Sequence, residues 1–163
     1  MSNSDASQRH SGRRFDSPRQ EAFLNLWRTY DRLRQIEDAL FGRYDLTAQQ
    51  YNALRLLRAA RPEKVPTLSV AGRLVSRAPD ITRLLDKLSD RGLIDRERPA
   101  DNRRIVNIAI TPAGVELLDA MAEEVRICAE KQLGHLSPEE VRVLIDLLRK
   151  ARQPHEAPDS DWI

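Results

Sequence analysis

Hydrophobic residues recur at helical spacing along most of this chain. Between about Pro18 and Phe41 they form one apolar stripe, which predicts a single long helix. Its members are Phe23, Leu26, Trp27, Tyr30, Leu33 and Ile36. Shorter stretches of the same kind, each with its own start signal, predict five further helices that begin at Thr47, Thr67, Ser76 to Pro79, Thr111 and Ser137.

Several of these starts carry specific capping patterns. Thr47 followed by Gln50, and Ser137 followed by Glu140, are spaced so that each side chain satisfies a free backbone donor of its partner. Thr111 precedes Pro112, a residue that is tolerated in the first turn of a helix. We also expect Thr67 to cap its short helix, with inward-facing side chains from Leu68, Ala71 and Leu74.

Two segments alternate between β-branched and polar residues, which predicts strands over 93–98 and 104–110. The polar residues 99–103 form the turn of the resulting hairpin. Gly92 supplies a left-handed stop to the preceding helix. The two prolines in 61–66 predict a loop there. The expected fold is therefore mainly α with a small β-hairpin wing.

The helix over about 76–91 has an apolar face and a polar face. Ile81, Leu84, Leu85 and Leu88 follow the spacing that would pack inward. The more outward set consists of Arg77, Asp80, Thr82, Arg83, Asp86 and Lys87. In a helix-turn-helix the second helix enters the major groove, where arginine can bridge two guanine acceptors. An ordinary solvated helix face is the alternative.

The distribution of charge favours the nucleic-acid interpretation. The whole chain has 27 Lys and Arg against 25 Asp and Glu, a net charge of +2. Residues 73–104 alone hold nine Lys or Arg against six Asp or Glu, a net charge of +3. Arg96, Arg98, Arg103 and Arg104 gather around the hairpin turn, where Asp101 could orient Arg103. The alternative is a charged hairpin tip without a ligand.

Composition sets the remaining bounds. Hydrophobic residues make up 40% of the chain, which suffices for a packed core. Residues 1–18 and 152–163 are polar and predict a disordered N-terminal arm and a C-terminal tail. The start of the chain lacks the apolar core of a signal peptide, and no apolar run approaches the ~20 residues of a membrane helix. We therefore expect a cytoplasmic protein without a membrane partner.

No catalytic motif stands out, so we do not expect an enzyme. There is no glycine-rich phosphate loop, and His10, His135 and His155 form no metal-ligand spacing with the single cysteine, Cys128. We expect no metal and no cofactor. Cys128 lies mid-helix and is interpreted as a buried, inert thiol, with a redox-sensing regulator as the alternative.

Three stretches together resemble the MarR family of winged-helix transcriptional regulators. They are LTAQQY at 46–51, VSRAPDITRLLDKLSDRGLI at 75–94 and RPADNRRIVNIAITPAG at 98–114, and the similarity extends over roughly 19–149. The third resembles the family's Asp-x-Arg wing motif. Counting back from Thr111 places the arginine of this motif at Arg104, whereas counting from Asp101 places it at Arg103. The sequence therefore leaves open which of the two arginines enters the minor groove.

The resemblance implies a homodimer on a pseudo-palindromic, double-stranded DNA operator. The implied DNA contacts are Ser76, Arg77, Pro79, Asp80, Thr82, Arg83, Lys87, Arg98, Asp101, Arg103 and Arg104. The implied domain over 19–151 has a DNA-binding lobe at about 47–111 and dimerisation helices at about 19–42 and 112–151. The implied interface includes Leu24, Trp27, Val141, Leu144 and Leu148, although without the resemblance such a stripe is more often core within one chain.

The resemblance also implies control by a small ligand, and the function expected is that of a ligand-responsive repressor. An aromatic or anionic effector would lie between the dimerisation helices and the winged lobe. Trp27, Tyr30 and Arg34 are candidates for lining its site, but they can also be core or surface residues. A winged helix used only as a protein-interaction module remains the rival interpretation.

Overall fold

The computed structural model describes residues 15–75, 80–100 and 102–156, and the chain divides into two compact units. The first unit is Met1–Gln35 and the second is Ile36–Ile163. The long helix α1 (Pro18–Gly42) crosses the boundary between them. Its start is fixed by Ser17, whose hydroxyl oxygen accepts the Gln20 N–H at 3.1 Å.

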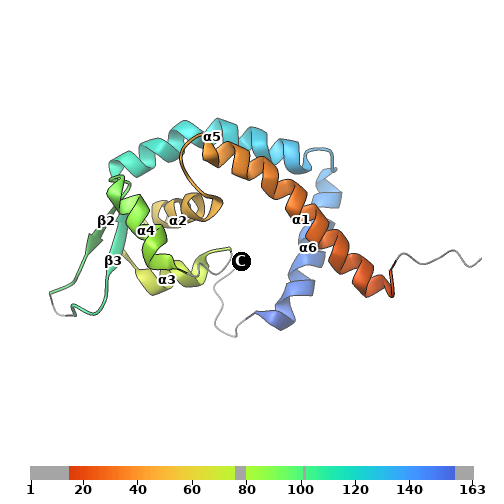
Figure 1. Ribbon diagram of the computed structural model, residues 1–163, viewed down its shortest axis with the longest axis horizontal. Coiled ribbons are helices and arrows are strands. Elements are labelled where there is room, and N and C mark those ends of the chain that lie inside the picture. The colour runs from red at the N-terminus through yellow and green to blue at the C-terminus, as the bar shows by residue number, and fades with distance from the viewer. Residues whose placement is uncertain (1–14, 76–79, 101, 157–163) are drawn as a thin grey trace, which may run out of the picture. The chain divides into compact units, whose positions relative to one another are not determined.

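The second unit contains every other element of the described chain (Figure 1). In order, these are α2 (Ala48–Ala59), β1 (Val65–Pro66), α3 (Thr67–Arg73), α4 (Ile81–Asp90), β2 (Ile94–Glu97), β3 (Asn107–Ile110), α5 (Pro112–Leu133), α6 (Pro138–Arg152) and the 3₁₀ turn η1 (Gln153–His155). The expected fold class, mainly α with a small β wing, is confirmed. None of the described helices is both long enough and apolar enough to cross a bilayer.

The wing holds one strand more than the sequence predicts. The antiparallel sheet has the order β1-β3-β2, with Ile94 opposite Ile110 and Val65 opposite Ile108. The two prolines predicted only a loop over 61–66. That prediction is wrong for Val65 and Pro66, which form β1. Pro66 is compatible with β1 because β1 is an edge strand, where a missing N–H donor costs little.

The predicted start and stop signals of the longer helices are confirmed. The capping boxes of α2 and α6 are complete, because Thr47 and Ser137 each exchange hydrogen bonds with the third residue of their helix. The Thr111 hydroxyl accepts the Gly114 N–H at the start of α5. Gly92 has a φ of 67°, the left-handed conformation expected after α4. These ends are local interactions, so spacing alone predicts them.

The short helix α3 differs from its prediction in phase. Val70 is buried, whereas Leu68, expected to face inward, is 83% exposed. Leu74 is buried as expected. Thr67 is the first residue of the helix and not its cap, because its hydroxyl donates to the Val106 carbonyl at 3.1 Å. The link to the segment that leads into β3 therefore sets how α3 is rotated.

Helix α4 begins later than expected. Its first residue is Ile81, and the Asp80 carboxylate caps it by accepting the Arg83 N–H at 2.9 Å. Residues 76–79, where the sequence places the start, lie outside the described residues. The expected C-terminal tail begins with η1, while the arm over 1–14 and residues 157–163 are not described.

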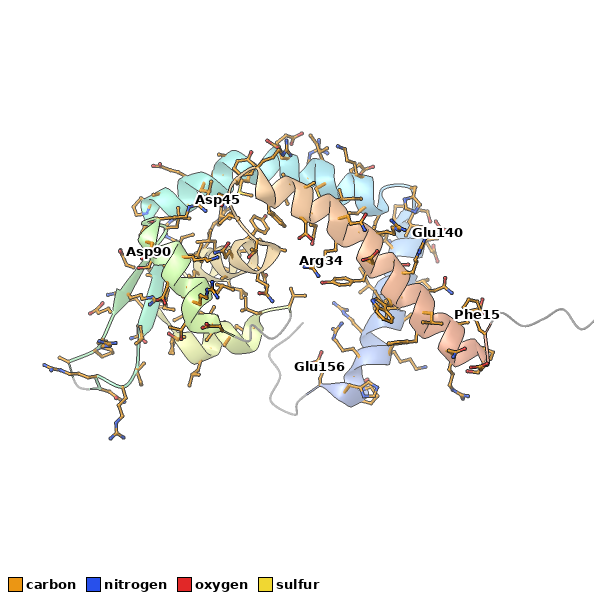
Figure 2. The ribbon with its side chains drawn as sticks, in the orientation of Figure 1. Phe15, Arg34, Asp45, Asp90, Glu140 and Glu156 are labelled. Carbon is orange, nitrogen blue, oxygen red and sulfur yellow. The ribbon has the colours of Figure 1, made fainter. Side chains whose placement is uncertain are left out.

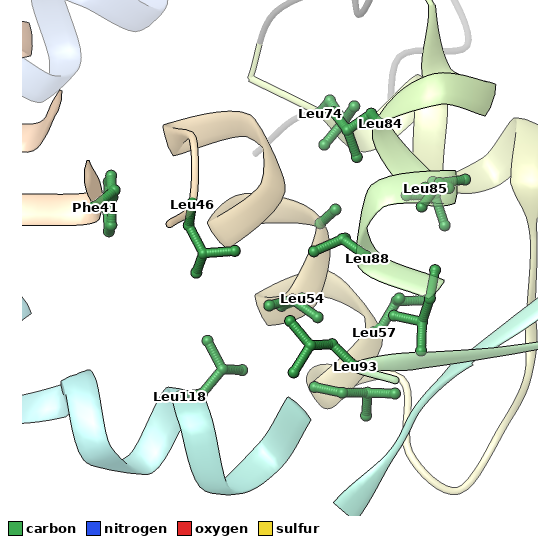
Figure 3. Close-up of a cluster of buried hydrophobic side chains, with 14 of the residues drawn as sticks. Phe41, Leu46, Leu54, Leu57, Leu74, Leu84, Leu85, Leu88, Leu93 and Leu118 are labelled. Atoms are coloured by element: carbon green, nitrogen blue, oxygen red, sulfur yellow. The ribbon is translucent and has the colours of Figure 1, made fainter. Parts of the chain in front are cut away.

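The core of the second unit is built mainly from leucines of α2 and α4 and from the wing (Figure 3). The predicted inward stripe of α4 is confirmed, since Leu84, Leu85 and Leu88 are buried and Ile81 is half-buried. They pack in one cluster with residues that include Leu54, Leu57, Leu93, Ile94 and Ile108. This cluster fixes which face of α4 points to solvent.

Two glycines provide a matched test of packing. A Cβ on Gly114 would collide with the Leu93 carbonyl oxygen and come within 2.7 Å of Ile110 Cγ1, whereas a Cβ on Gly72 would meet nothing within 4 Å. We predict that Gly114→Ala lowers the free energy of unfolding by about 1–3 kcal/mol through overpacking. Gly72→Ala should leave it unchanged or raise it by up to ~1 kcal/mol, because alanine favours helix. Urea unfolding at fixed protein concentration measures both, and equal stability of the two variants would contradict the packing described.

Candidate nucleic-acid interface

The solvent face of α4 is polar and lies opposite the leucine stripe. Thr82, Arg83, Asp86 and Lys87 are all exposed. Arg83 and Lys87 make no ion pair with another described residue, so both cations are available for a ligand. Of the other residues predicted on this helix, Ser76, Arg77 and Pro79 lie outside the described residues.

Asp80 has a local role that the sequence interpretation did not recognise. Its Oδ1 atom caps α4 by accepting the Arg83 N–H. The carboxylate thus stabilises the first turn of α4, which contains Thr82 and Arg83. The sequence carried a signal for this cap, because Asp80 directly precedes the apolar stripe that begins at Ile81, and aspartate is a preferred N-cap residue.

The loop between β2 and β3 presents the wing arginines. Arg98, Arg103 and Arg104 are exposed and form no ion pair with any other described residue. Short-range hydrogen bonds shape this loop: Asn102 Oδ1 accepts the Arg104 N–H at 3.2 Å, and the Asn102 carbonyl accepts the Ile105 N–H at 3.1 Å. Asp101, which we expected to orient Arg103, lies outside the described residues. The wing therefore offers three cations on a turn.

Arg96 behaves differently from its neighbours in the predicted basic cluster. Its Nη1 lies 2.5 Å from Asp86 Oδ1, and its Nη2 donates to the Thr82 carbonyl at 3.3 Å. Both partners belong to α4, so this arginine joins β2 to the helix. The adjacent Glu97 pairs with Lys64 in the loop that leads into β1. Spacing along the chain offers no signal for either pair.

Arg91 is also committed within the protein. Its Nη1 and Nη2 donate to the carbonyls of Asp45 and Tyr44 at 2.6 and 3.1 Å. Both carbonyls lie in the loop after α1, so Arg91 ties the end of α4 to that loop. The Tyr44 hydroxyl donates to Glu124 Oε1 on α5 at 2.7 Å, and this hydrogen bond is the main reason that the pKa of Tyr44 is raised.

The three residues predicted to line a ligand site do not share a described pocket. Trp27 is 63% exposed and borders a hollow of about 350 Å³ with Leu24, Arg28 and Asp31. Neither Tyr30 nor Arg34 lines this hollow. A larger pocket of about 540 Å³, which the sequence did not predict, lies in the second unit. It is lined by Ile36, Ala39, Leu40, Arg43, Glu124, Ile127, Cys128 and Lys131.

Cys128 is a buried thiol in α5. It is 7% exposed, and burial is the main cause that raises its pKa above the usual value. A raised pKa leaves less of the reactive thiolate at neutral pH, which favours the interpretation as an inert core cysteine. Among the described residues, no three His, Cys, Asp or Glu side chains are grouped to hold a metal ion.

These features define a winged helix-turn-helix protein: α3 and α4 form the helix pair, and the three strands carry the wing. The family model described as "MarR family" matches residues 46–106. The transcriptional regulator HosA of Escherichia coli O157:H7 is 30% identical over 130 residues, covering 76% of this chain and 93% of HosA. The crystal structure of a MarR transcription factor from Planctomyces limnophilus is 55% identical, covers 83% of this chain and 98% of that one, and has a TM-score of 0.68.

The chain belongs to the MarR family of DNA-binding transcriptional regulators, which is not a family of enzymes. Two more distant structures share the fold. Sco3205 of Streptomyces coelicolor, crystallised in complex with DNA, is 16% identical with a TM-score of 0.80, covering 91% of this chain and 94% of that one. BpsR of Bordetella bronchiseptica, described with a mechanism by which 6-hydroxynicotinic acid regulates its DNA binding, is 24% identical with a TM-score of 0.72, covering 80% and 98%.

The buried thiol gives a direct chemical prediction. Because burial raises the pKa of Cys128, iodoacetamide at pH 7.5 should alkylate the native protein at least ~10-fold more slowly than the same protein unfolded in urea. Mass spectrometry over time measures both rates, and the unfolded sample serves as the control. Equal rates in the two states would mean that burial does not protect Cys128, and a faster rate in the native protein would indicate a reactive, sensor-like thiol.

Proposed function

We propose that this chain acts in the cytoplasm as a homodimer that binds a pseudo-palindromic DNA operator. The observation that carries the proposal is the juxtaposition of two cationic surfaces on one lobe: the exposed face of α4 and the arginine-bearing loop after β2. A helix of this kind fits the major groove, and a neighbouring basic loop can contact the backbone or the minor groove. Phosphate contacts would supply much of the affinity.

The roles of the individual residues follow from their positions. Thr82 and Arg83 stand in the first turn of α4, where recognition helices contact base edges, while Lys87 is a turn further on and suits a phosphate. Asp80 assists by capping the helix. We retain Ser76, Arg77 and Pro79 as proposed contacts at the approach to α4, and Arg98, Asp101, Arg103 and Arg104 as proposed wing contacts. Either Arg103 or Arg104 enters the minor groove in this proposal.

The dimer proposal is supported by apolar surface on the terminal helices. Helix α6 has no buried residue. Val141, Leu144 and Leu148 are half-buried, while Val143 and Leu147 are 52% and 60% exposed. Leu24 and Trp27 in the first unit are also exposed. Apolar patches on this scale favour association, because each Å² removed from water contributes about 25 cal/mol.

This assignment gives each part of the domain a task. We propose that about 47–111 form the DNA-binding lobe, within a domain over 19–151. The helices at about 19–42 and 112–151 would dimerise, and 1–18 and 152–163 would be an arm and a tail. Two lobes held by such helices could be spaced to reach successive major grooves.

We further propose that the protein is a repressor whose DNA binding responds to a small aromatic or anionic molecule. The support is the shared fold with BpsR, whose DNA binding is described as regulated by 6-hydroxynicotinic acid. A ligand that binds one spacing of the two lobes more tightly shifts the population away from the other. Trp27, Tyr30 and Arg34, all in the first unit, remain the proposed lining.

Selection of bound duplexes from a random DNA pool tests the DNA proposal. The wild-type protein should enrich a pseudo-palindrome whose half-sites are centred one helical turn apart, ~34 Å. Failure to enrich any sequence, together with binding to a protein partner, would favour a protein-interaction module.

Arg83→Ala should cost about 1–3 kcal/mol of binding free energy on the enriched duplex and relax base choice at one position, because the alanine side chain cannot hydrogen-bond a base edge.

The double variant Arg103→Ala plus Arg104→Ala is the matched contrast to Arg83→Ala. It should weaken binding on every sequence, and it should lower the slope of log K against log salt by about 1 for each phosphate that the wing arginines neutralise. Fluorescence anisotropy at several salt concentrations measures this slope. Unchanged affinity of the double variant at low salt would remove the wing from the interface.

The dimer proposal is tested on α6. Leu144→Asp plus Leu148→Asp should weaken self-association at least ~30-fold, because both carboxylates would lose solvation in an apolar interface. Lys150→Asp, a charge change away from the Leu144 and Leu148 stripe, is the control and should leave the dimer intact. Sedimentation equilibrium gives both constants. A double variant that remains dimeric would exclude this face of α6 from the interface.

A further inference from the structure

Arg96 bridges the wing and the recognition helix with both ends of one guanidinium. The Arg96 side chain extends from β2, and its Nη1 atom pairs with Asp86 Oδ1 at 2.5 Å. Its Nη2 atom donates to the Thr82 carbonyl at 3.3 Å. Thr82 and Asp86 are four residues apart and therefore adjacent on one face of α4. The Arg96 side chain is 27% exposed and that of Asp86 is 50% exposed. The bridge is thus partly shielded from water.

We propose that Arg96 is a positioning residue that sets the angle between α4 and the wing, and that it does not itself contact DNA. The inference rests on the proposed DNA-binding function. A dimer that uses both surfaces must hold them at one spacing, because the groove and the adjacent backbone have fixed positions on a duplex. Among the described residues, the Arg96–Asp86–Thr82 bridge provides the side-chain hydrogen bonds that join β2 to the end of α4 proposed to face DNA.

The chemistry of the bridge requires arginine. Its planar fork has donors that point in two fixed directions, so it can pair with a carboxylate and donate to a carbonyl at once. A lysine ammonium is a compact point charge without this fixed fork, so it could keep the pair with Asp86 but not the same two-point geometry. The Thr82 carbonyl has a second lone pair to accept the bond while it remains in the helix.

The competing role for Arg96 is that of a phosphate ligand, like the other wing arginines. The two roles predict opposite signs at Asp86. If Arg96 contacts phosphate, removing the Asp86 charge frees the guanidinium and removes a repulsion, so DNA binding tightens. If Arg96 positions α4, removing the same charge breaks the bridge and DNA binding weakens.

Four variants separate these roles: Arg96→Gln, Asp86→Asn, the combination of both, and Arg96→Lys. Asp90→Asn is the matched control, because Asp90 is an exposed carboxylate one turn further along α4, at the far end of the helix (Figure 2). The probes are a duplex enriched by the wild-type protein from a random pool, and poly(dI-dC) for non-specific binding. Anisotropy titrations at several salt concentrations give the affinity and the salt slope.

The positioning role predicts that Arg96→Gln and Asp86→Asn each weaken binding to the enriched duplex on the order of 10-fold. The double variant should be no weaker than either single variant, because both remove one bridge. The salt slope should not change, since every phosphate keeps its cation, and binding to poly(dI-dC) should fall less. Arg96→Lys should recover part of the affinity, and Asp90→Asn should bind as well as wild type or better.

Two results would overturn the inference. One is unchanged or tighter binding by Asp86→Asn, matching Asp90→Asn; the other is a salt slope that falls by about 1 in Arg96→Gln. If Arg96→Gln does not fold, as judged by circular dichroism, Asp86→Asn and Arg96→Lys decide the sign. A wild-type protein that enriches no duplex instead overturns the proposed function, whereas wild-type binding with an unaffected Asp86→Asn overturns only the positioning role.

Discussion

The burial of the leucine stripe of α4 is the constraint on which the rest of the interface depends. Leu85 and Leu88 are almost fully buried against α2 and the strands, so the helix cannot rotate without exposing them. Full exposure of such a side chain costs about 1.5–3 kcal/mol, which exceeds the value of any one exposed ion pair on the same helix. Because the apolar face is fixed, Thr82 and Arg83 must face solvent.

Polar interactions then refine what packing determines. Exposed ion pairs contribute little to stability, generally below about 1 kcal/mol, so the bridge from Arg96 to Asp86 is a weak argument for folding. It is a stronger argument for orientation, because a two-point contact restricts the angle between a strand and a helix. The modest net charge of the chain fits this division of labour. Arg91 and Arg96 of the basic segment bond to other parts of the protein, whereas Arg83 and the wing arginines make no ion pair with another described residue.

Features built from neighbouring residues could be predicted, whereas those that join distant segments could not. The capping pair of Thr47 and Gln50 and the stop at Gly92 depend on a few adjacent residues, and both occur as predicted. Strand β1 exists because β3 pairs with it, and no pattern within 61–66 could indicate that. The phase of α3 has the same origin, because Thr67 donates to Val106, a residue distant in the sequence.

The candidate site follows the same division. The polar face of α4 and the wing arginines were predictable from periodicity and local charge, but the commitment of Arg91 and Arg96 to internal partners was not. Arg91 holds the end of α4 to the carbonyls of Tyr44 and Asp45, and Tyr44 in turn donates to Glu124 on α5. Helix α4 is therefore tied near its first turn to the wing and at its end to the loop that precedes α2. Because both ends of α4 are bonded to its own lobe, we expect the proposed recognition surface to move with that lobe and not as a separate helix.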